Sequence, residues 1–116
     1  MKLCLRPLCL VVVTQRLIPA GFAGYTVGPV VLVRPGTSAA LLVHEQTHAR
    51  QFWRCLGCNG LLYQVSRRWR LRLELEAYRA QLAVAGPPAA LRLSAALASQ
   101  YGLDLTQEEA YRLLTA

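Results

Sequence analysis

The two histidines of this 116-residue chain lie four residues apart, within the stretch LLVHEQTHARQF at residues 41–52. On an α-helix, His44 and His48 would be separated by only about 40° around the axis, so both imidazole rings could reach one metal ion. Glu45 would lie about 100° from His44, where its carboxylate can approach a water without binding the metal. If the stretch is helical, its spacing predicts two metal ligands and a general base on neighbouring faces of one helix. The alternative is that both histidines are ordinary helix residues.

The segments before this stretch have the composition of β-strands. Residues 2–13 alternate weakly and then run apolar, which predicts one or two short strands. Residues 25–33 are rich in β-branched side chains and predict another strand. Within it, Gly28 and Pro29 would place that strand at a sheet edge or in a bulge, because proline has no N–H to donate.

Helical patterns follow, separated by glycine, proline and polar residues. The expected helices cover about residues 39–56, 61–84, 89–101 and 106–116. At the start of the last one, Thr106 and Glu109 fit a capping box. Strands followed by helices favour an α+β fold class, and the length of the chain suits a single domain.

A zinc site needs a third protein ligand, and the chain has no third histidine. Before the C-terminal tail, the only acids after His48 are Glu74 and Glu76. Glu74 borders the apolar stripe of its expected helix, whereas Glu76 shares an arc with arginines and is typical of an exposed, salt-bridged carboxylate. Cys55 is about 10 Å along the helix from His48, too far for the same ion. Glu74 is the predicted ligand. The stripe comprises Leu71, Leu75, Tyr78 and Leu82, and the arginines are Arg72 and Arg79.

The motif His44-Glu45-x-x-His48, followed by Glu74-x-x-Ala77, resembles a gluzincin metallopeptidase reduced to its minimum. Residues 20–82 more closely resemble small uncharacterised bacterial and phage proteins with the same motif. The resemblance implies a zincin-like domain over 1–116, with its metal site between two helices.

In such a domain, residues 1–36 would form strands and loops, 37–85 the metal-binding helices and 89–116 the C-terminal helices. The resemblance implies one Zn²⁺ and a peptide or protein substrate. The ion would polarise the peptide carbonyl and activate a water, and Glu45 would take the proton and deliver it to the leaving amine. An edge strand near residues 30–33 could hold the extended substrate.

The chain departs from the gluzincin pattern at two residues that would support the metal ligands or the transition state. Tyr78 stands where an acidic residue commonly orients a histidine, and its hydroxyl could take that role only in part. Gln51 could hydrogen-bond near the site or lie on a solvated face. The histidine that larger gluzincins use as a transition-state donor has no counterpart, and the possible substitutes are Tyr63, Tyr101, Tyr111 or an arginine.

The charge of the chain is uneven. The net charge is +7, and residues 1–72 carry a single acid, Glu45. A basic half could meet nucleic acid, an anionic membrane surface or an acidic partner, or it could be a solvated face. Nucleic-acid binding through SRRWRLR (66–72) is disfavoured, because its arginines scatter around the helix.

Two further alternatives concern zinc. The chain could be a non-catalytic binding or phage-structural module stabilised by zinc at the same site. Its four cysteines could also form a separate four-thiolate site, although small buried thiols are favoured. These cysteines are Cys4, Cys9, Cys55 and Cys58.

The apolar N-terminal segment is too short for a targeting or spanning element. Its longest uninterrupted apolar run, residues 8–13, falls short of the roughly 7–15 residues of a secretory core and the roughly 20 of a spanning helix. We therefore expect no signal peptide or membrane span, and a cytoplasmic protein. The oligomeric state stays open.

Overall fold

The computed structural model describes residues 1–116 and begins with one four-stranded sheet. The strands are β1 (Lys2–Leu5), β2 (Leu8–Val13), β3 (Gly24–Val27) and β4 (Val30–Val33). Their order across the sheet is β1-β2-β4-β3, with β2 and β4 parallel and the outer pairs antiparallel. The central strands β2 and β4 are therefore fully paired, and β1 and β3 are the edges.

Residues 25–33 form a hairpin, so the predicted single strand at a sheet edge or in a bulge is wrong. Val27 pairs with Val30, and the two residues between them make the turn. Gly28 has a φ of 57°, a left-handed conformation that glycine adopts without steric cost. The expectation of a sheet edge at residues 30–33 is also wrong, because β4 lies between β2 and β3.

Five α-helices follow the sheet, with one short 3₁₀ turn. They are α1 (Ala39–Arg54), α2 (Asn59–Val65), α3 (Arg67–Ala85), η1 (Pro87–Ala89), α4 (Ala90–Gln100) and α5 (Gln107–Thr115). The capping box predicted at Thr106 and Glu109 is confirmed. The single helix predicted over 61–84 is wrong, because Ser66 is extended and its hydroxyl accepts from the Trp69 N–H to start α3.

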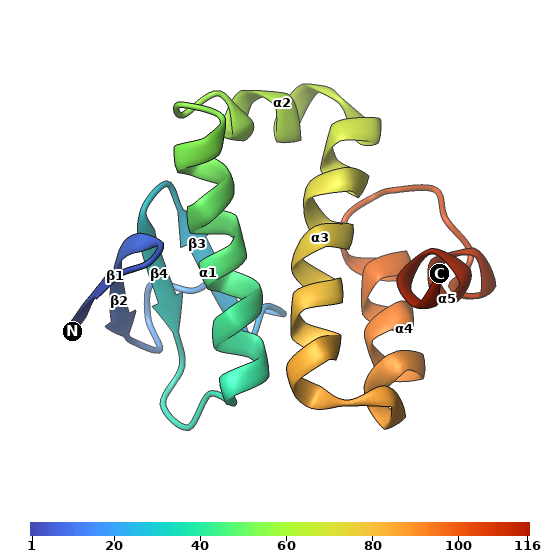
Figure 1. Cartoon of the computed structure of the whole chain (residues 1–116), viewed down its shortest axis with the longest axis horizontal. Helices are drawn as coiled ribbons and strands as arrows, with labels where there is room; N and C mark the ends of the chain where they lie inside the picture. The colour runs from blue at the N-terminus through green and yellow to red at the C-terminus, as the bar shows by residue number, and fades with distance from the viewer.

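Helices α1 and α3 lie side by side at the centre of the molecule and run in opposite directions (Figure 1). The sheet packs on α1, whereas α4 and α5 pack on α3. The predicted α+β class is confirmed. Helix α2 crosses from the end of α1 to the start of α3.

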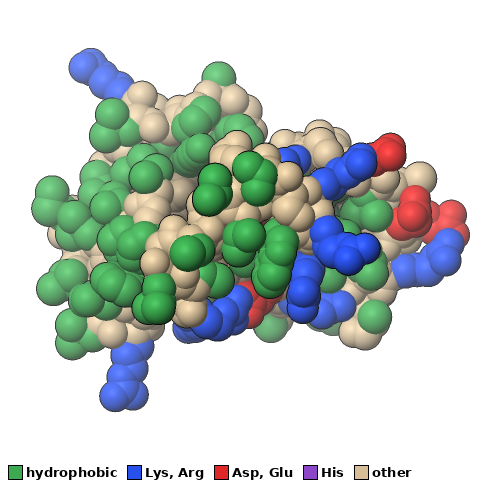
Figure 2. Space-filling model, turned by 90° about the horizontal axis from the view of Figure 1, so that it is seen from above, with side chains coloured by type: hydrophobic (Ala, Val, Ile, Leu, Met, Phe, Trp, Pro, Cys, Tyr) green, Lys and Arg blue, Asp and Glu red, His purple; other side chains and the backbone are tan.

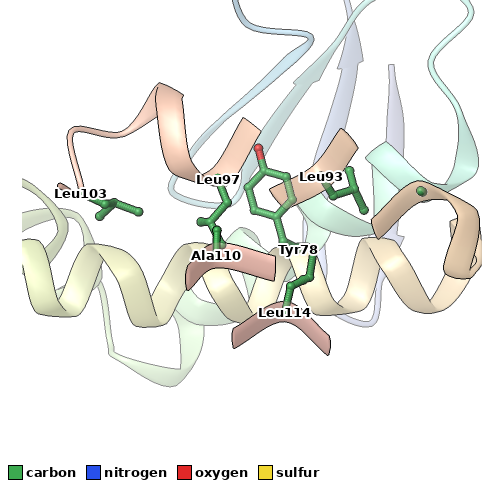
Figure 3. Packing of buried hydrophobic residues seen from close by; sticks show 7 residues of the cluster. Tyr78, Leu93, Leu97, Leu103, Ala110 and Leu114 are labelled. Atoms are coloured by element: carbon green, nitrogen blue, oxygen red, sulfur yellow. The ribbon is translucent and has the colours of Figure 1, made fainter. Parts of the chain in front are cut away.

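Each of the two central helices belongs to its own apolar cluster. The cluster under the sheet contains Cys9, Val11, Val31, Val33 and Ala49. The helical cluster, drawn in Figure 3, contains Tyr78, Ala89, Leu93, Leu97, Leu103, Ala110 and Leu114. The predicted stripe of α3 is confirmed, since Leu71, Leu75 and Leu82 pack against this second cluster beside Tyr78. The space between the clusters is where α1 faces α3.

None of the helices combines the length and the apolar character that a membrane crossing requires.

Candidate metal centre

Three side chains meet between α1 and α3. His44 and His48 come from α1 and Glu74 from α3, and their nearest potential ligand atoms all lie within 4.8 Å of one another. Glu74 Oε1 is 3.4 Å from His44 Nε2 and 3.2 Å from His48 Nε2. All three side chains are largely buried, with exposures of 4%, 15% and 4%. We call these three residues the candidate metal centre.

Gln51 fixes the orientation of the His48 ring. Its side-chain oxygen lies 2.9 Å from His48 Nδ1, and its Nε2 donates to Leu73 O at 2.9 Å and to Glu76 Oε1 at 2.7 Å. Because the amide nitrogen is committed to two acceptors, the amide oxygen must accept from the Nδ1–H of His48. The lone pair of neutral His48 is therefore on Nε2, which faces Glu74.

An imidazole lone pair facing a carboxylate oxygen is repulsive unless a cation or a proton lies between them. Without a metal, a proton takes that place. Burial disfavours the charged His48 ring, but the Glu74 carboxylate outweighs it and raises the pKa of His48 to about 9. Burial likewise opposes ionisation of Glu74, and His48 and His44 outweigh it and lower the pKa of that carboxyl to about 2. In the metal-free protein these shifts favour a charged His48 beside a charged Glu74.

Glu45 lies beside the centre without joining it. Its Oε1 is 4.0 Å from His44 Nε2, and its Oε2 accepts a hydrogen bond from Thr26 Oγ1 at 3.0 Å. Gly24 leaves room for this carboxylate, since a Cβ there would lie 3.1 Å from Glu45 Cγ. Burial raises the pKa of Glu45. Contacts from β3 therefore hold a fourth buried group, the Glu45 carboxyl, beside the three potential metal ligands.

Tyr63 also contacts the candidate metal centre. From the sequence it was only one of several possible transition-state donors. From α2, its hydroxyl donates to Glu74 Oε2 at 2.7 Å. Burial and the Glu74 charge raise the pKa of Tyr63, so the hydroxyl keeps its proton. With Oε2 held by Tyr63, Glu74 presents Oε1 to the two histidines. No periodic pattern could reveal this contact, because it joins two helices across a turn.

Tyr78 touches the centre with its ring and not with its hydroxyl. The ring lies edge-to-face with His44 at 4.5 Å, and the hydroxyl pairs with that of Tyr101 at 2.8 Å. His44 Nδ1 is buried and has no hydrogen-bond partner. The orienting role expected of the Tyr78 hydroxyl is therefore wrong, and His44 is held by ring packing and by its contact with Glu74. Tyr111, another suggested donor, is exposed on α5.

Glu76 is half-exposed and salt-bridged, as the helical pattern predicts, but with a different partner. Its carboxylate binds Arg54 of α1, with oxygen–nitrogen distances of 2.7 and 2.9 Å. The hydrogen bond from Arg54 lowers the pKa of Glu76. The sequence pointed to Arg72 and Arg79 on the same helix, because a single-helix wheel cannot show a neighbour across the α1–α3 interface.

The four cysteines do not form a second metal site, so the four-thiolate possibility is wrong. Cys4 and Cys9 face each other on β1 and β2, and all four thiols are free. Among the His, Cys, Asp and Glu side chains, no other group of three or more lies close enough together to hold a metal ion. Cys9 is buried as expected, but Cys58 is exposed.

Comparisons with protein-family models, with curated proteins and with solved structures found no match to this chain. The likeness to gluzincins therefore rests on the residues and their placement, and it stays a prediction.

Proposed function

We propose that this protein is a zinc-dependent metallopeptidase of the gluzincin type, with His44, His48 and Glu74 as the zinc ligands. The observation that carries the proposal is the convergence of three donor atoms from two helices beside a fourth, separately held carboxylate. Three protein ligands leave one position open, which distinguishes catalytic from structural zinc sites.

The donor set fits zinc. Two imidazole nitrogens and one carboxylate oxygen form a common catalytic zinc set, and imidazole favours transition metals over magnesium or calcium. Gln51 holds His48 in the tautomer whose Nε2 can bind a metal. When bound, zinc supplies Lewis-acid chemistry, since it polarises a carbonyl group and makes water more acidic.

Glu45 is the general base of the proposed reaction. Its Oε2 is held by Thr26, and its Oε1 is directed toward the side of His44 Nε2. Burial raises the carboxylate's affinity for a proton, so Glu45 can take one from the attacking water and return it to the leaving amine. Thr26 keeps the carboxylate in place during both transfers.

The free edge of β3 is the proposed place for an extended peptide. β3 is an edge strand, and it carries Gly24 and Thr26, the two residues that touch Glu45. A peptide that adds a strand to this edge would gain backbone hydrogen bonds close to the general base.

A second candidate is a zinc-stabilised module that cuts nothing. The burial of the site favours it, because His44, Glu45 and Glu74 are each at most 5% exposed. Such a module would bind zinc and lose its fold on chelation, while Glu45 would be dispensable for its activity as a binder.

The deciding experiment compares bound zinc and peptide hydrolysis in the parent, Glu45→Gln and Glu76→Gln. Elemental analysis should find about one zinc in all three, because neither carboxylate is a ligand. Hydrolysis of a mixed fluorogenic peptide library should fall by about 10²-fold or more in Glu45→Gln and stay near the parent rate in Glu76→Gln.

Other outcomes separate the two candidates. If the parent binds zinc but hydrolyses no peptide, the metallopeptidase is excluded and the non-catalytic module remains. Absence of zinc from the parent after reconstitution would overturn both.

A further inference from the structure

One end of the molecule exposes large apolar side chains that belong to neither apolar cluster. They come from the start of β2, the end of α1 and the turn after it, α2 and the start of α3. We call this set the α2 surface. Its members are Leu8, Trp53, Leu56, Leu61, Val65 and Trp69, with exposures from 38% to 89%.

The segments that carry the α2 surface contact one another. Trp53 Nε1 donates to Leu8 O at 2.6 Å, and the N–H of Leu56 donates to the carbonyl of Trp53. Leu61 and Val65 are one helical turn apart on α2, a helix without a single buried residue. Figure 2 looks down on this end and shows hydrophobic side chains over its left and centre, where the sheet and α2 lie. Contiguous apolar patches of this kind mark interaction sites.

Leu56 is the member of the α2 surface that the isolated fold uses least. It has a φ of 53°, a conformation that disfavours a bulky residue and favours glycine or asparagine, and its side chain is 89% exposed. A leucine at this position costs stability and buries nothing. Its apolar side chain therefore needs an explanation outside the isolated chain.

The charge around the α2 surface is positive. Arg6, Arg68 and Arg72 are exposed beside it without a carboxylate partner, and Arg72 lies over the ring of Trp69 at 4.9 Å. Each acid of the chain is buried, paired with an arginine or used as a helix cap. Glu45 and Glu74 are buried, Glu76 pairs with Arg54, Asp104 with Arg67 and Glu108 with Arg112, and Glu109 caps α5.

This charge decides between the possible occupants. A second copy of the chain could cover the leucines, but two copies that each carry a net charge of +7 repel each other and add no excess of carboxylates for Arg6 or Arg68. Nucleic acid offers phosphates but no apolar layer for Leu56 and Leu61. The interface of an anionic bilayer offers both, since tryptophan and leucine enter the acyl boundary while arginines meet the headgroups. We propose that the α2 surface docks the protein on anionic membrane surfaces.

Intrinsic tryptophan fluorescence can report this docking. Its only two tryptophans, Trp53 and Trp69, belong to the α2 surface. Full-length protein is titrated with vesicles of phosphatidylcholine alone, or with about 30% phosphatidylglycerol. We expect a blue shift of tryptophan emission and co-sedimentation with the anionic vesicles only. Raising NaCl from about 0.1 to 0.5 M should weaken binding several-fold.

Variants locate the surface. Leu61→Glu should weaken binding to anionic vesicles by about tenfold or more. Its matched control is Leu91→Glu on α4, since the two leucines are similarly exposed at 69% and 65%. Leu56→Asn should weaken vesicle binding while the midpoint of urea unfolding stays the same or rises, because asparagine tolerates the left-handed conformation. A loss of vesicle binding without a loss of stability would show that Leu56 serves docking and not folding.

Several results would overturn the proposal. These are no binding of the parent to anionic vesicles, equal binding to neutral vesicles, or equal losses in Leu61→Glu and Leu91→Glu. A concentration-dependent dimer in sedimentation velocity that Leu61→Glu abolishes would assign the surface to a second copy of the chain instead.

Discussion

At the residue scale, the candidate metal centre depends on side chains that hydrogen-bond to its potential ligands and fix their orientation. His48 has such a support in Gln51, which is fully buried and makes three hydrogen bonds. His44 has none, because its Nδ1 is unpaired. Of the two histidines, only His48 therefore has a hydrogen-bonding group that fixes its ring.

We predict that Gln51→Met lowers zinc affinity by about 10–100-fold, the usual effect of losing a group that orients a ligating histidine. Methionine keeps the length of the side chain but cannot fix the ring of His48 with an acceptor oxygen. Chelator competition would measure the affinity. The matched control is Gln81→Met, which removes another buried amide, one whose Oε1 has no partner. Equal losses in both variants would contradict the role of Gln51.

That His44, His48 and Glu74 come together could be predicted from the sequence, whereas most of the contacts that support them could not. His44 and His48 share one helical face, and Glu74 borders an apolar stripe, so periodicity within single helices was sufficient. Thr26 and Tyr63 reach the site from β3 and α2. Their contacts depend on how separate elements pack, which no local pattern encodes.

At the element scale, the closeness of β3 to α1 decides where Glu45 lies. Gly24 is buried on β3, and a Cβ at this position would meet Glu45 Cγ at 3.1 Å and the carbonyl oxygen of Leu32 at 3.3 Å. The strand can approach the helix this closely only because residue 24 lacks a side chain.

We predict that Gly24→Ala destabilises the protein by about 1–2 kcal/mol, because a backbone oxygen and a buried carboxylate must both move to admit the methyl group. Urea unfolding would measure the change. Gly60→Ala is the control, since Gly60 lies in α2 with open space around its Cα, and alanine there should stabilise by about 0.5 kcal/mol or more. A neutral Gly24→Ala variant would show that β3 can withdraw from α1.

The boundaries of elements were predicted less well than the elements themselves, and each error has a local cause. A strand pattern runs through Gly28 and Pro29, so only the pairing of Val27 with Val30 reveals the hairpin. The helical pattern likewise runs through Ser66, whose extended backbone separates α2 from α3. In both cases the pattern of apolar residues continued where the chain direction changed.

At the scale of the whole molecule, the candidate metal centre lies where the two halves meet. One apolar cluster joins the sheet to α1, and the other joins α3 to α4 and α5. Between them, the charged and hydrogen-bonding groups of α1 and α3 face each other. A metal ion bound there would connect α1 to α3, and through them the two halves of the fold.

We predict that zinc affinity rises about tenfold per pH unit from about pH 7 to pH 9, because zinc must displace the proton on His48. In the metal-free protein, Glu74 outweighs the effect of burial and raises the pKa of His48 to about 9, so the ring carries a proton below that pH. An unperturbed histidine, with a pKa of about 6.5, would make the affinity level off above about pH 7. Calorimetry in buffers of different ionisation enthalpy should show about one proton released per zinc near pH 8. Release of no proton there would mean that Glu74 does not hold His48 in its charged form.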